Sequence, residues 1–140
     1  MPELKFETGV VTFMVNGKCE VSFNPTDSAF VEKLFNAFDT LDKRQERYKE
    51  QISSAKDNRE VFQVARSQDA EMREIIDGVF GPVSKELFGD MNVYALADGL
   101  PVWANLMLAV MDEVDTSFAR EQKKTNPRVA KYTAKYKNDL

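Results

Sequence analysis

One run of residues constrains the fold of this chain more than any other. Residues 102–111 read VWANLMLAVM, in which nine of the ten residues are apolar. A helix with apolar side chains all around it must be buried on nearly every side. We therefore expect a central helix with Pro101 in its first turn, which the rest of the chain surrounds and which becomes amphipathic through Val114 and Phe118.

Asn105 is the single polar residue in this run. A buried amide must find hydrogen-bond partners. The simplest interpretation is a hydrogen bond from Asn105 to the backbone of a loop. The alternative is a polar contact that sets the register of an oligomer interface.

A β-hairpin is predicted near the N-terminus. Residues 10–23 form two β-rich runs separated by Asn16-Gly17, the strongest short-range signal for a tight turn. If these two residues alone form the turn, Met14 faces Cys19, and Cys19 lies on the more apolar face of the hairpin. The opposite face then carries Val11, Phe13 and Val15. We expect the hairpin to pack on its own helices, with pairing to a partner strand through this second face as the alternative.

Helices are predicted for most of the chain between these two features. Asn24–Ser28 is rich in helix-starting residues, and a second cap follows at 53–58. Gly81-Pro82 ends the second helix, and a short helix over Ser84–Phe88 closes at Gly89. Another turn or two of helix is expected near 92–97. The inward-facing residues are expected to be Phe30, Leu34, Phe38, Leu41, Tyr48 and Ile52 in the first helix and Phe62, Ala65, Met72, Ile76 and Val79 in the second.

The charge of the chain is divided unevenly. The whole chain carries a net charge of −4, but residues 120–140 hold seven basic and two acidic side chains, a net charge of +5, which leaves −9 for the remainder. An acidic body repels nucleic acid, so nucleic acid is a disfavoured partner. In the tail, Lys131, Tyr132, Lys135 and Tyr136 are candidate contacts for an acidic or helical protein, or for the chain's own body. The tail can form a helix only when something packs against it.

Catalytic apparatus is missing from the sequence. Histidine is absent, and Cys19 is the only cysteine. No glycine-rich phosphate loop follows a strand, and the acidic cluster at 112–115 matches no calcium loop. We therefore expect a protein that is not an enzyme and holds no cofactor or metal. No segment approaches the roughly 20 apolar residues of a membrane helix, so we expect a cytoplasmic protein without membrane contact.

Together these features predict an α+β fold, mainly α, in which an N-terminal β-hairpin packs on a bundle of about four helices. Residues 1–120 are expected to form a single domain, with the hairpin at 10–24 and the helical part at 25–120. Residues 121–140 form a basic tail that need not be ordered.

The order of these features resembles that of tail assembly chaperones, small proteins from Gram-positive phages and prophages. The resemblance rests on the hairpin that ends in Val21-Ser22-Phe23-Asn24-Pro25 and on the helix that contains Phe30-Val31-Glu32-Lys33-Leu34-Phe35. Acidic helices and a lysine-rich end follow in the same order. The resemblance covers most of residues 10–120 and includes no active-site motif.

The resemblance implies a non-enzymatic helper in tail morphogenesis. Such chaperones keep the long, helix-rich tape measure protein soluble and help to recruit tail tube subunits around it, and a ribosomal frameshift often yields a longer second product. Tape measure and tail tube proteins are therefore the expected partners, and self-association is left open. The alternatives are a phage or bacterial regulator that contacts nucleic acid through its basic tail, and a structural component of the virion.

Overall fold

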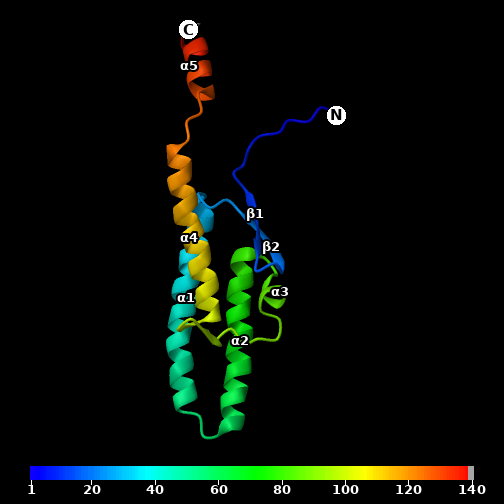
Figure 1. Ribbon diagram of the computed structural model, residues 1–140, viewed down its shortest axis with the longest axis vertical. Helices are drawn as coiled ribbons and strands as arrows, with labels where there is room; N and C mark the ends of the chain where they lie inside the picture. The colour runs from blue at the N-terminus through cyan, green and yellow to red at the C-terminus, as the bar shows by residue number, and fades with distance from the viewer. Residues whose placement is uncertain (139–140) are drawn as a thin grey trace.

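The computed structural model describes residues 1–138, which form five helices and two small two-stranded sheets (Figure 1). The predicted class, α+β and mainly α, is therefore confirmed. In chain order the elements are β1 (Val11–Val15), β2 (Cys19–Phe23), α1 (Ser28–Ser53), α2 (Asn58–Phe80), α3 (Ser84–Phe88), β3 (Leu96–Ala97), β4 (Leu100–Pro101), α4 (Val102–Lys123) and α5 (Arg128–Asn138).

Helices α1 and α2 form an antiparallel pair that runs most of the length of the body (Figure 1). Each begins at an aspartate cap: Asp27 accepts a hydrogen bond from the Ala29 N–H at 3.0 Å, and Asp57 accepts one from the Glu60 N–H at 2.9 Å. Their apolar stripes lie where the sequence predicts them, with one exception. Phe62 was expected to face inward but is 59% exposed, because it lies at the edge of a surface cavity beside Tyr48 and Tyr94.

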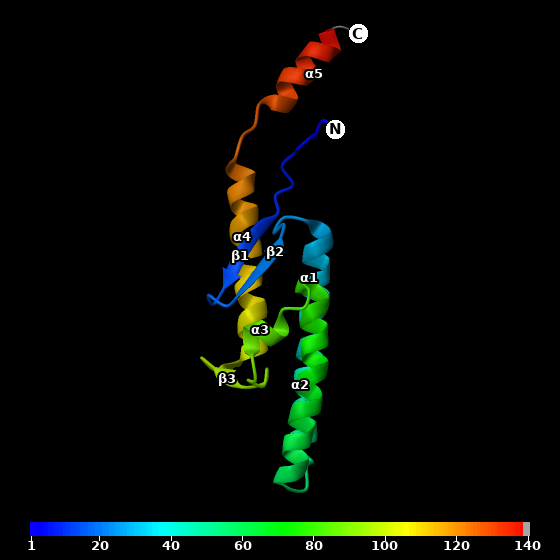
Figure 2. The same cartoon turned by 90° about the vertical axis from the view of Figure 1, so that its right-hand side faces the viewer.

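Helix α4 packs beside this pair rather than at the centre of a bundle (Figure 2). Trp103 anchors it: the side chain is 2% exposed, and its Nε1–H donates to Gln45 Oε1 at 2.8 Å. The expected burial on nearly every side is wrong, because Ala109 is exposed and Leu106 is only partly buried. The Asn105 side chain is only partly buried and donates to the Ala97 carbonyl at 2.9 Å, so its partner is a backbone group of its own chain, as predicted, but one in β3 rather than in a loop.

An aromatic cluster attaches the hairpin to one end of the α1–α2 pair. The ring of Phe23 stacks on Phe30 of α1, with centroids 4.4 Å apart, and lies 6.3 Å from Phe80 of α2. On its other side, the Phe23 ring stacks on Phe13 at 4.9 Å. Because β2 supplies the buried residues Cys19, Val21 and Phe23, it is the strand that holds the hairpin to the helices.

The pairing register of the hairpin differs by one residue from the prediction. Asn16 and Gly17 form the expected turn, with positive φ angles of 52° and 66°, but Lys18 stays outside the ladder and Val15 pairs with Cys19. An extra residue in one strand reverses which side chains share a face. Consequently Val11, Phe13 and Val15 lie on the same face as the buried residues of β2, not on the opposite one.

The segment between α3 and α4 is held by Arg73 of α2. Its Nη2 donates to the carbonyls of Gly89 at 2.8 Å and Met91 at 2.7 Å, and its Nε donates to Asp69 Oδ2 at 3.0 Å. The helical turns expected near 92–97 are wrong. Asp98-Gly99, another tight-turn dipeptide, instead closes the β3–β4 hairpin with φ angles of 55° and 78°.

The two ends of the described chain extend from the same end of the body (Figures 1 and 2). Residues 1–10 form no strand, and Leu4 and Phe6 in this arm are 99% and 85% exposed. Asn24 ties this arm to the body, because its Nδ2 donates to the Thr8 carbonyl at 2.8 Å. Helix α5 projects beyond α4 after a short linker.

Replacing Arg73 with methionine should lower the free energy of unfolding by about 2 kcal/mol, because hydrogen bonds from a charged group that hold the α3–β3 segment are lost. Urea unfolding followed by circular dichroism measures this change. Arg66, an exposed arginine on the same helix, is the matched control. Equal stability of Arg73→Met and Arg66→Met would contradict the assigned role of Arg73.

Candidate functional site: an apolar groove beside α4

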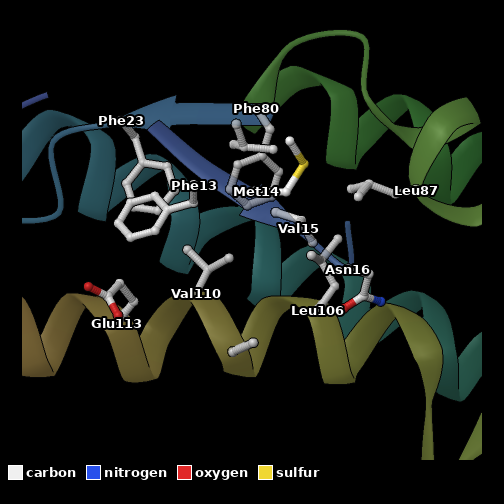
Figure 3. Close-up of a pocket in the computed structure, with 12 residues that line it drawn as sticks. Phe13, Met14, Val15, Asn16, Phe23, Phe80, Leu87, Leu106, Val110 and Glu113 are labelled. Atoms are coloured by element: carbon white, nitrogen blue, oxygen red, sulfur yellow. The ribbon is translucent and has the colours of Figure 1, made fainter. Parts of the chain in front are cut away.

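A groove runs between α4 on one side and the hairpin with the N-terminal arm on the other, and Figure 3 shows its middle section. We call it the α4 groove. Its middle section, of about 260 Å³, lies between β1 and the Leu106–Glu113 stretch of α4. A wider section of about 780 Å³ shares Phe13 and Glu113 with it and continues toward Lys124. A third section, of about 350 Å³, continues from Leu106 toward Val102.

The hairpin wall of the α4 groove contains all three hairpin residues that the sequence nominates for partner binding. Phe13 lines the middle and wide sections, Val11 lines the wide section, and Val15 lines the middle and third sections. They reach the groove because of the corrected register, which turns them toward α4 and the core. Phe13 and Val15 are partly buried, whereas Val11 remains 44% exposed.

The α4 wall of the groove was missed by the sequence analysis. Leu106 and Val110 point from α4 into the middle section, with Phe80 and Leu87 on its opposite side (Figure 3), and Ala109 also lines this section. The signal for this wall was present in the apolar run at 102–111, which has more apolar side chains than a helix packed on one side needs. We interpreted the excess as burial within the chain, and the structure leaves part of it at the groove.

The groove changes character toward the C-terminal end of α4. Glu113 Oε1 accepts hydrogen bonds from Ser117 Oγ at 2.9 Å and from Arg120 Nη2 at 3.4 Å. One turn further on, Lys124 Nζ lies 3.1 Å from Glu121 Oε1. The wide section is therefore bordered by charged groups of both signs, and the middle section is mostly apolar.

Cys19 faces the core from β2. It is 6% exposed, beside Val21 and Phe23 as predicted. Burial raises the pKa of the Cys19 thiol, and the nearby Glu86 carboxylate raises it further. A raised thiol pKa disfavours the nucleophilic thiolate, so the position is that of a small apolar core residue.

Another surface cavity lies beside the first turns of α2. It has a volume of about 450 Å³ and is lined by the Tyr48 and Tyr94 rings together with Phe62. The two tyrosine rings stack with centroids 3.7 Å apart, and burial raises the pKa of Tyr94 to about 12. Both tyrosines are thus neutral packing groups at physiological pH, and this cavity brings together none of the nominated residues.

The nominated residues of the tail lie on α5, away from the groove. The rings of Tyr132 and Tyr136 lie 6.5 Å apart, with Lys131 Nζ 5.4 Å from the first ring and Lys135 Nζ 5.5 Å from the second. Tyr132 and Tyr136 are 45% and 58% exposed. The structure therefore separates the two nominated surfaces, one on the hairpin and one on the tail.

Methionine side chains suit adaptable binding surfaces, but most of the methionines near α4 and α2 are packing residues. Met72 and Met107 are fully buried in the core, and Met111 is partly buried against it. Only Met91 is well exposed, at 53%, and it lines the third section of the groove.

Filling the groove should remove an apolar binding site without unfolding the protein. Ala109 is exposed and lines the middle section, so Ala109→Trp should weaken the binding of the uncharged dye Nile red roughly tenfold, which corresponds to about 1.4 kcal/mol of lost contact. The free energy of unfolding should change by no more than about 0.5 kcal/mol.

The matched control is Ala119→Trp, at an exposed alanine of the same helix. A fluorescence titration compares the two variants with the native chain. Equal dye affinities for the two variants would show that the dye does not bind in the α4 groove.

Within residues 1–138, no cluster of three or more His, Cys, Asp or Glu side chains could hold a metal ion, and no helix is both long and apolar enough to cross a membrane. The arrangement is suited to binding an apolar surface. In comparisons with known proteins, the chain matches no protein family, no curated protein and no solved structure.

Proposed function

We propose that this protein is a non-enzymatic tail assembly chaperone that holds a helical segment of the tape measure protein in the α4 groove. The observation that carries the proposal is the groove itself, whose apolar floor is formed by Leu106, Ala109 and Val110 facing Phe13 and Val15. Exposed apolar grooves with polar borders are typical of sites for amphipathic helices.

The dimensions of the groove favour a helical client over an added β-strand. The groove follows α4 from Val102 to Lys124, which corresponds to about 33 Å of helix. Strand β1 has five residues and offers only about 17 Å of edge for pairing. A client strand would leave half of the groove unused, whereas a client helix of roughly 20 residues could contact its full length.

Charge favours a client whose apolar strip is bordered by basic residues. The body carries −9 outside the tail. Basic residues beside a client's apolar strip would be attracted by this field and would speed its association. Covering the client's strip would keep a long helical protein from aggregating before tail tube subunits assemble around it.

Co-expression with the tape measure protein of the same phage or prophage tests this proposal. The native chain should raise the amount of tape measure protein in the soluble fraction and co-elute with it on size exclusion. Ala109→Trp should abolish both effects by filling the groove, and Ala119→Trp should preserve them.

A soluble fraction that does not change, with no complex on size exclusion, would refute the chaperone function. If the complex forms equally well with Ala109→Trp, the protein is a chaperone but the α4 groove is not its binding site. Recovery of the protein in purified virions would instead indicate a structural component.

A further inference from the structure

Helix α5 carries an apolar face that the body leaves uncovered. Val129, Tyr132 and Tyr136 lie at helical spacing on this face and are 76%, 45% and 58% exposed. An isolated helix of 11 residues is below the length of roughly 12 to 15 residues at which helices become even marginally stable in water. The helix therefore needs a surface that covers this face.

The connection between α4 and α5 allows α5 to turn back on α4. Four residues separate Lys123, the last of α4, from Arg128, the first of α5. Loops of about two to five residues join antiparallel helix pairs. The start of α5 does not depend on α4, because the Arg128 N–H donates to Asn126 Oδ1 at 3.1 Å and the Lys131 N–H donates to the Pro127 carbonyl at 3.0 Å.

The length of α5 matches the wide section of the groove. Eleven residues span about 16 Å, so a helix folded back from the linker reaches to the level of Glu113. The wide section lies along this stretch of α4, with Val11 and Phe13 on its far wall. The carboxylates of Glu7, Glu113 and Glu121 border it together with Arg120 and Lys124, three negative against two positive charges, whereas residues 128–138 contain four basic side chains and no acidic one.

We propose that α5 folds back antiparallel to α4 and occupies the wide section of its own chain's groove, as a latch. Val129, Tyr132 and Tyr136 then cover Val11 and Phe13, and the basic side chains of α5 lie beside the carboxylates of the border. The extended arrangement in Figures 1 and 2 is the open form of the latch.

The occupant is the chain's own helix rather than that of a second copy. A short linker gives α5 an effective concentration in the millimolar range, far above that of a second copy at micromolar protein. The regulatory consequence rests on the proposed function. A tape measure helix must displace α5 from the groove, so apolar segments that bind the groove more weakly than α5 does are excluded from it.

Cysteine cross-linking in the full-length chain tests the latch. The background is Cys19→Ala, which removes the single native thiol. Glu121→Cys on the groove side of α4 is paired with Thr133→Cys beside the apolar face of α5. The control pair is Ala119→Cys with Thr133→Cys, at nearly the same separation along the chain but on the opposite side of α4.

With a short bis-maleimide, the Glu121 pair should cross-link within one chain roughly tenfold faster than the Ala119 pair, since burial of two tyrosine rings stabilises the latched form. Intact mass distinguishes one bridging reagent from two single attachments. Adding Tyr132→Ser and Tyr136→Ser should reduce the rate of the Glu121 pair to that of the control.

Equal rates for the two pairs would show that α5 is a free tether and would overturn the latch. Covalent dimers as the main product would assign the groove to a second copy and would also overturn it. Neither result depends on the tape measure protein, so failure of the latch and failure of the chaperone function are distinguishable.

Discussion

The stacking of Phe23 on Phe30 determines where the hairpin lies, and the rest of the binding surface depends on it. This contact, with Phe80 beside it, fixes β2 to the end of the α1–α2 pair. Stacked aromatic pairs contribute roughly 0.5–1.5 kcal/mol beyond their buried area. Because Trp103 separately fixes α4 to α1, the hairpin and α4 are attached to the same pair of helices at different places. The groove is the space that these two attachments leave between them.

Much of the fold follows from local patterns in the sequence. The caps at Asp27 and Asp57 and the stop at Gly81-Pro82 determine where helices begin and end, and these signals act within a few residues. The short helix at Ser84–Phe88 follows from the same logic. Such elements are predictable because the interactions that define them are short in sequence.

Two errors of the sequence analysis both concern the groove. A tight-turn dipeptide indicates a hairpin but not the number of residues in its loop, and Lys18 outside the ladder reverses the faces of the ribbon. Apolar periodicity predicts burial but does not reveal whether the chain itself supplies the covering surface. Val11, Phe13 and Val15 were thus nominated for partner binding on the wrong face, and Leu106 and Ala109 were assigned to a core that they only border. The first error arises from the length of a local loop and the second from long-range packing.

The central claim is that the α4 groove is where a helical client is held. Hydrogen–deuterium exchange of the protein, measured alone and with the tape measure protein, tests it most directly. The account predicts that bound client slows exchange at the backbone amides of β1 and its turn, with smaller changes at the far end of α1 and α2. Protection confined to the α1–α2 tip, with β1 exchanging as in the free protein, would contradict it.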